Sequence, residues 1–234
     1  MKNSRITLLG ISVALSLSSF AGPASAAPAR DWPQWLAHYY QTPQADQVVP
    51  AVFALSNSGY FEEAGQRATA IGFLGAVFAQ NPDRVSVWMS AFRFLPVAHQ
   101  RLVASALWYS GLPGGEERLR ALAGDSNPAL RGEIEQLIAQ GAPSLRDTPV
   151  LSESSLNLQW GAFLATGESR HIVNVLAALG SGEPGLSSAA RFALAEKAAV
   201  HNRVYEICQT ELTRQPAAVR DQLRAAMVNV KPQP

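Results

Sequence analysis

The chain has 234 residues, of which 47% are hydrophobic, 16% charged and 8% aromatic. This composition is typical of a globular protein and excludes a disordered or fibrous chain. Because Lys2 and Arg5 are the only charged residues among the first 26, the remaining 208 carry 17 basic and 18 acidic side chains. A net charge of −1 provides no dense basic face, which argues against nucleic acid as a partner.

The first 26 residues have the pattern of a secretory signal peptide. Lys2 and Arg5 precede an uncharged apolar stretch at 6–20, and small residues up to Ala26 form a cleavage pattern. The apolar stretch is shorter than the roughly 18 residues that cross a bilayer, and Ala27 stands where a lipoprotein needs cysteine. We therefore expect a periplasmic or secreted bacterial protein that keeps no transmembrane segment after cleavage.

Helical periodicity runs through the rest of the chain, whereas the alternation typical of strands is rare. In the segment 32–55, Pro33, Pro43 and Pro50 interrupt the pattern. Further along, apolar side chains recur at helical spacing in seven segments, which are 85–92, 102–107, 130–138, 156–164, 172–179, 204–212 and 219–227.

Several of these segments carry their own start and stop signals. Asn127 and Pro128 are typical of a helix start, as is Ser152, while Gly141 and Gly167 are typical of a stop. Each helix is about three turns long and is marginal alone in water, so it must pack against its neighbours. We expect an all-α fold of stacked antiparallel helical hairpins, either an irregular α-solenoid of the tetratricopeptide or HEAT type or a helical bundle.

A short pattern recurs at three helix ends. An apolar residue, two variable residues, Ser or Thr and then glycine occur at Gly59, Gly111 and Gly167, and an acid follows each within a few residues. Glycine suits the left-handed position after a helix, and an acid suits the positive start of the next one. The recurrence fits a degenerate solenoid and an irregular bundle equally well.

The polar segment 144–155 separates two predicted lobes. It has no apolar stripe, and Pro143 and Pro149 flank and interrupt it. We expect an N-terminal helical lobe at 27–148, a C-terminal helical lobe at 149–230 and a disordered tail at 231–234.

The sequence offers no catalytic, cofactor or metal site. The four histidines, His38, His99, His171 and His201, show no zinc-ligand spacing. The single cysteine, Cys208, can form no internal disulfide and lies on an apolar helical face, which predicts a buried thiol. No nucleophile elbow or phosphate-binding loop is present. We therefore favour a protein that is not an enzyme.

Aromatic residues near the predicted mature N-terminus are the candidates for partner binding. Trp32, Trp35 and Tyr39 share one helical face. They either dock a short helix onto the domain or present an apolar face to a protein or peptide partner.

Three segments together resemble an uncharacterised family of exported, all-helical bacterial proteins. They are Asn81-Pro82-x-Arg84-Val85-x-x-Trp88, the Ala-Leu-Trp-Tyr-Ser-Gly run at 106–111 and the Trp-Gly-Ala-Phe-Leu-Ala-Thr-Gly-Glu run at 160–168. The resemblance implies a helical-repeat-like fold and carries no activity with it.

The leading functional hypothesis is a non-enzymatic helical-repeat protein that binds another protein or peptide in a groove between its hairpins. A second hypothesis is a periplasmic hydrolase or transferase with a dispersed site, such as His171 with Glu168 and Arg170. A third is a carrier of an apolar ligand, because the glycines in the apolar stretch 71–78 either leave space for one or allow close helix packing.

Overall fold

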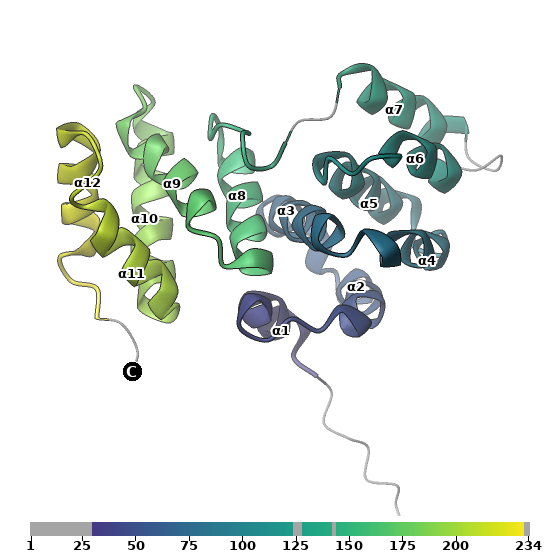
Figure 1. Cartoon of the computed structure of the whole chain (residues 1–234), viewed down its shortest axis with the longest axis horizontal. Coiled ribbons are helices and arrows are strands. Elements are labelled where there is room, and N and C mark those ends of the chain that lie inside the picture. Colours follow the sequence, from purple (N-terminus) through teal and green to yellow (C-terminus); the bar gives the residue numbers. More distant parts are fainter. Residues whose placement is uncertain (1–29, 124–127, 142–143, 232–234) are drawn as a thin grey trace, which may run out of the picture. The chain divides into compact units, whose positions relative to one another are not determined.

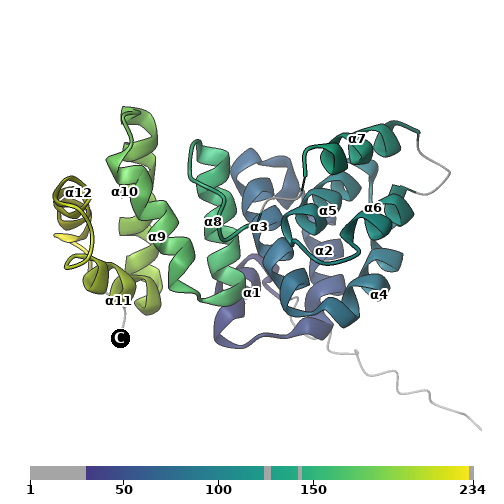
Figure 2. The same ribbon diagram turned by 45° about the horizontal axis from the view of Figure 1, so that its top comes forward.

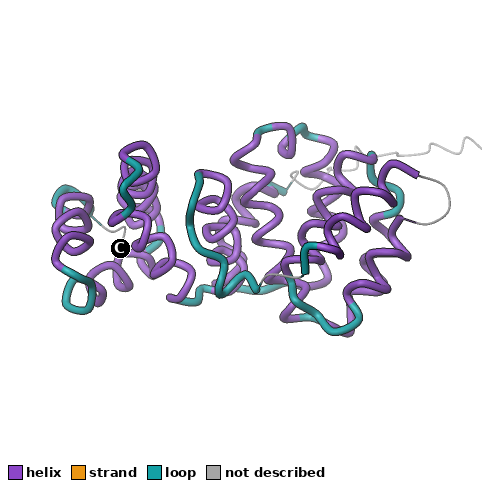
Figure 3. The backbone as a smooth tube through the Cα atoms, turned by 90° about the horizontal axis from the view of Figure 1, so that it is seen from above, coloured by secondary structure: helices purple, strands orange, loops and turns teal. Residues whose placement is uncertain are grey.

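The computed structural model describes residues 30–123, 128–141 and 144–231. These residues form twelve α-helices and four 3-10 helices, with no strand among them, which confirms the all-α class (Figures 1 and 3). The α-helices are α1 (Trp32–His38), α2 (Val48–Asn57), α3 (Ala64–Gln80), α4 (Pro82–Phe92), α5 (Val97–Tyr109), α6 (Gly115–Ala123), α7 (Pro128–Ala139), α8 (Glu153–Thr166), α9 (Ser169–Ala177), α10 (Pro184–Val200), α11 (Asn202–Glu211) and α12 (Ala217–Met227). The 3-10 helices are η1 (Tyr39–Gln41), η2 (Ala45–Gln47), η3 (Tyr60–Glu62) and η4 (Ala178–Gly180).

The described residues from Asp31 onward form one compact unit. The predicted signal peptide at 1–26, the predicted cap Asn127 and the tail at 232–234 lie outside the described residues. Within the described part of the chain, no helix has both the length and the apolar character that crossing a membrane requires.

The prolines of the first segment start helices or separate them. Pro33 lies in the first turn of α1, which Asp31 caps by accepting a hydrogen bond from the backbone N–H of Gln34 at 3.0 Å. Pro50 lies in the first turn of α2, and Pro43 lies between η1 and η2. A proline lacks the N–H that a first turn leaves unpaired anyway, so α1 and α2 tolerate Pro33 and Pro50.

The two most closely packed helices, α3 and α8, lie far apart in the sequence and side by side in the fold (Figures 1 and 2). Their contact depends on two glycines. A Cβ atom at Gly72 of α3 would lie 1.9 Å from the carbonyl oxygen of Leu158, and one at Gly161 of α8 would lie 1.9 Å from that of Thr69. The other glycine of the apolar stretch 71–78, Gly75, lies against α5, where a Cβ atom would be 3.0 Å from the carbonyl oxygen of Ala106. Close backbone approach therefore accounts for both glycines of this stretch.

The glycines predicted to end helices do so. Gly59, Gly111, Gly141 and Gly167 all adopt positive φ values, between 62° and 78°. Gly167 caps α8 directly and donates its N–H to the carbonyl of Phe163 at 2.7 Å. This local conformation explains why glycine recurs, while the solenoid form stays a prediction.

Consecutive helices pack as pairs along much of the chain, as α6 with α7, α8 with α9, and α10 with α11. Helix α3 departs from that scheme, because it packs mainly against α8 and α5 and only lightly against the adjacent α4. Its side chains Phe73, Leu74, Val77 and Phe78 are all at most 2% exposed. A central helix covered by non-consecutive neighbours thus joins the early and late parts of the chain.

The polar segment before α8 is attached to that helix by one buried side chain. Gln159, which is fully buried, donates from Nε2 to the carbonyl oxygens of Leu145 and Thr148, each at 2.8 Å. Leu145 and Val150 belong to the same hydrophobic core as α3 and α8. Residues on both sides of position 148, where we expect a lobe boundary, therefore share that core.

Candidate functional site

A groove of about 540 Å³ opens between α1, α3, α8 and α10. Its apolar lining includes Leu36, Leu156, Trp160 and Leu164, each at most 5% exposed, so the groove floor belongs to the hydrophobic core. Phe192 of α10 also lines it and leaves 72% of its surface exposed. An exposed aromatic side chain beside an apolar floor is typical of a surface that takes up another apolar group.

The charged side chains of this groove are Glu153, Glu196 and Lys197. The ammonium of Lys197 lies 3.1 Å from Oε1 of Glu196, so these two charges compensate each other. Glu153, in the first turn of α8, forms no ion pair with the described residues. The groove therefore carries an excess of one negative charge, which favours a positively charged group on whatever enters it.

The aromatic residues predicted to bind a partner hold α1 on the core. Tyr39 is 1% exposed and packs edge to face on Phe73, with ring centroids 5.1 Å apart. Trp35 packs edge to face on the same ring at 5.8 Å and donates its indole N–H to Oε1 of Gln44 at 3.2 Å. Trp32 is half-buried and lies against Trp35. Tyr39 and Trp35 therefore dock α1 onto the domain, whereas Trp32 leaves part of its surface exposed.

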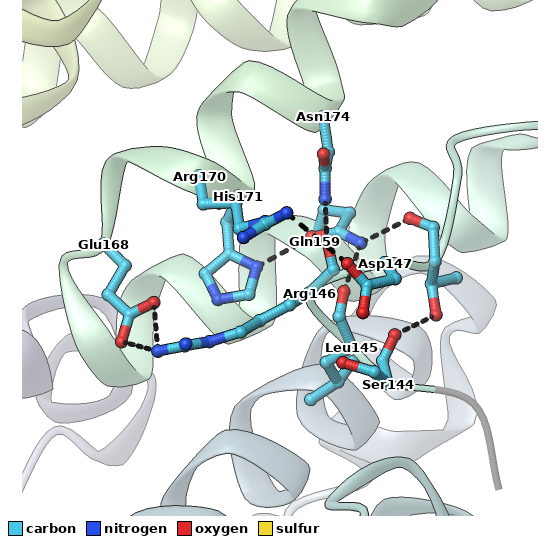
Figure 4. A network of polar contacts seen from close by, with 10 residues as sticks. Ser144, Leu145, Arg146, Asp147, Gln159, Glu168, Arg170, His171 and Asn174 are labelled. Carbon is cyan, nitrogen blue, oxygen red and sulfur yellow. Dashed lines mark hydrogen bonds and ion pairs between the residues drawn. The ribbon is translucent and has the colours of Figure 1, made fainter.

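A second polar region surrounds His171 at the start of α9 (Figure 4). The imidazole is 2% exposed, and its Nδ1 lies 2.8 Å from Oε1 of Gln159. Arg146 approaches the same region from the loop before α8, where its Nη2 donates to both oxygens of Glu168 at 2.8 and 3.0 Å. Asn174 donates to the carbonyl of Arg146 at 3.0 Å and holds that loop in place.

Burial controls the protonation of His171. Burial is the main cause that lowers the pKa of the imidazole, the Glu168 carboxylate partly opposes this shift and the Arg146 guanidinium adds to it, and the resulting pKa is about 4. The ring is therefore neutral at pH 7. It lines a cavity of about 220 Å³ together with Arg146, Glu168 and Tyr109.

The dispersed set proposed from the sequence, Glu168, Arg170 and His171, is only partly brought together. Glu168 and His171 line this cavity, whereas Arg170 extends toward Asp147, with 3.4 Å between Nη2 and Oδ1. Arg146 takes the place expected for Arg170. Sequence reasoning missed it because the loop has no periodicity that relates position 146 to α9.

Burial also shifts the pKa values of Cys208 and His201 strongly. Cys208 is fully buried, and burial raises the pKa of its thiol to about 12, which confirms the predicted buried thiol. Burial lowers the pKa of His201 to about 4, and its Nδ1 lies 3.5 Å from the Tyr40 hydroxyl. Over the described residues, no group of three or more His, Cys, Asp or Glu side chains has the arrangement of a metal site.

Fold and sites together define an all-α protein with an apolar groove between four helices and a small polar cavity beside a buried histidine. No family model matches the chain. Searches of curated proteins and of solved structures gave no match either. The resemblance to an exported helical family therefore stays an expectation.

Proposed function

We propose that this chain is a non-enzymatic, exported helical-repeat protein that binds a short peptide segment of another protein in the groove between α1, α3, α8 and α10. The observation that carries the proposal is the groove itself, whose 540 Å³ lies within the range of roughly 300–1,000 Å³ typical of ligand sites. Export to the periplasm or beyond is supported by the pattern of residues 1–26.

The lining of the groove supports a particular kind of peptide. An apolar side chain of the ligand fits between Phe192 and the floor made by Leu156 and Trp160. A neighbouring Arg or Lys of the ligand complements the uncompensated Glu153. The recognised segment therefore has an apolar anchor beside a basic residue.

Fluorescence anisotropy with labelled synthetic peptides tests the proposal. Peptides with a central leucine flanked by arginine should bind, and the same peptides with glutamate in place of arginine should bind more weakly. Replacing Glu153 by Gln should reduce this difference. Absence of binding by every apolar-anchored peptide contradicts the proposal.

Two exposed phenylalanines provide a matched pair of variants. Phe192→Ser removes the aromatic wall of the groove, and the loss of a buried aromatic contact corresponds to about tenfold to hundredfold weaker binding. Phe94→Ser makes the same change at a side chain that is 77% exposed and lies outside the groove, so binding should not change. Equal effects of the two substitutions would show that peptides bind elsewhere.

A further inference from the structure

The buried imidazole of His171 has one nitrogen whose hydrogen-bonding capacity is unused. The Nε2 of Gln159 donates to two backbone carbonyls, so its Oε1 faces His171 and accepts a hydrogen bond from Nδ1. A neutral imidazole with its proton on Nδ1 carries a lone pair on Nε2. Within the described ranges, no residue donates to that lone pair. The ring is thus a fixed hydrogen-bond acceptor, oriented by Gln159.

This acceptor lines a small cavity with an ion pair in its wall. Figure 4 shows the free ring nitrogen on the side of Arg146 and Glu168, and all three residues line the same 220 Å³. Ala76 and Leu145 add an apolar surface. The cavity is smaller than the roughly 300 Å³ minimum of drug-sized sites and corresponds to about seven water molecules of roughly 30 Å³ each. It suits a small molecule with one polar end and one short apolar end.

The ion pair adds a requirement on the ligand's charge. Arg146 uses a single nitrogen, Nη2, for both oxygens of Glu168, which leaves the N–H groups of Nε and Nη1 able to donate. The wall therefore presents a positive and a negative group side by side, with no net charge. A ligand with one charge is attracted by one of these groups and repelled by the other, whereas a ligand with both charges matches both.

We propose that this cavity binds a small zwitterion, namely a free α-amino acid with a short apolar side chain. Its ammonium group donates to Nε2 of His171 and to the Glu168 carboxylate, and its carboxylate accepts from Arg146. Its side chain packs against Ala76 and Leu145. This site is separate from the peptide groove, so either can fail in experiment without the other.

Calorimetric titration of the purified protein tests the charge requirement. L-valine and L-alanine should bind, while isovalerate, which is L-valine without the ammonium group, and isobutylamine, which is L-valine without the carboxylate, should each bind at least about tenfold more weakly. No heat with either amino acid at millimolar concentration overturns the proposal. Equal affinity for L-valine and either single-charge compound overturns it as well.

Substitutions of two surface arginines distinguish the loss of a contact in the cavity from the general effect of removing a positive charge. Arg146→Ala should weaken L-valine binding at least about tenfold. Arg170→Ala removes a similarly exposed guanidinium, also paired with an acid, that does not line the cavity, and it should leave the affinity within about twofold. Equal effects of the two substitutions contradict the proposal.

Nitrogen NMR of the histidine rings tests the contact in the unmodified protein. L-valine should shift the Nε2 resonance of His171 toward that of a nitrogen accepting a hydrogen bond. The resonances of His201, which is also buried but does not line the cavity, should stay in place. Binding that leaves the His171 resonance unchanged would place the amino acid at another site.

Discussion

The crossing of α3 and α8 makes a sharp prediction for Gly161→Ala. The added Cβ would lie 1.9 Å from the carbonyl oxygen of Thr69 and 2.7 Å from the backbone nitrogen of Phe73. Both obstacles are backbone atoms of a buried helix, so no side chain can rotate away. Cβ atoms in proteins essentially never approach another heavy atom more closely than 3.0 Å. To reach that distance from the Thr69 oxygen, the two helices must separate by about 1 Å.

The size of the effect follows from the contacts that this separation weakens. A buried side chain makes about 40–60 atomic contacts of about 0.1–0.2 kcal/mol each, and a gap of about 0.5–1 Å forfeits at least about a quarter of that attraction. For two side chains at the crossing the loss is about 2–6 kcal/mol. Alanine returns about 1 kcal/mol through its higher helix propensity. We expect a net loss near 3 kcal/mol, or about 6–12 °C in Tm.

Urea denaturation followed by circular dichroism measures this loss, with Gly132→Ala as the matched control. Gly132 lies on the exposed face of α7, and a Cβ there would meet no atom within 4 Å. The control should gain about 0.5–1 kcal/mol from helix propensity. If both glycine substitutions stabilise the protein, the argument from backbone contact is wrong.

Three further perturbations probe the polar interior and one helix end. His171 and His201 have pKa values of about 4 in the folded chain against about 6.5 when unfolded, so the unfolded chain binds more protons between these values. The stabilisation that follows from keeping both rings neutral is fully present above about pH 6.5 and declines as the pH falls toward 4. At about pH 5 the free energy of unfolding should be lower by about 2 kcal/mol per histidine. Equal urea midpoints at about pH 7.5 and about pH 5 would refute this. Gln159→Leu leaves two backbone carbonyls and one ring nitrogen of His171 without partners. It should lower the free energy of unfolding by about 3–6 kcal/mol in the same assay. A loss below about 1 kcal/mol would mean that water replaces the amide. Ser152→Ala removes the N-cap of α8 and should lower Tm by about 2–4 °C, while Ser154→Ala in the same turn should leave it nearly unchanged; equal shifts would argue against the cap.

The helix ends could be predicted from the sequence because their causes are local. Ser152 accepts from the N–H of Ser155 in a capping box, and Gly167 adopts the left-handed conformation, as their residue types indicate. Pro128 likewise begins α7. Each of these signals depends on residues within one turn, so no knowledge of distant neighbours is needed.

The pairing of α3 with α8 could not be predicted in the same way. Gly72 and Gly161 are each compatible with an open space, a flexible helix or a close approach, and only the partner decides between these. The polar cavity illustrates the same limit. Arg170 and His171 are adjacent in the sequence, but successive residues of a helix point about 100° apart, so Arg170 faces Asp147 instead of the cavity. Arg146, which the cavity uses, comes from a loop with no periodic signal.

The meeting of Gly72 with α8 also has a consequence for biogenesis. The two glycines are about 90 residues apart in the chain. At synthesis rates of about 5–20 residues per second, roughly 5–20 s pass between the emergence of α3 and that of its main partner. During this interval α5 can already pack on α3, but the face of α3 that later lies against α8 has no permanent cover, so the native core stays incomplete until α8 has been synthesised.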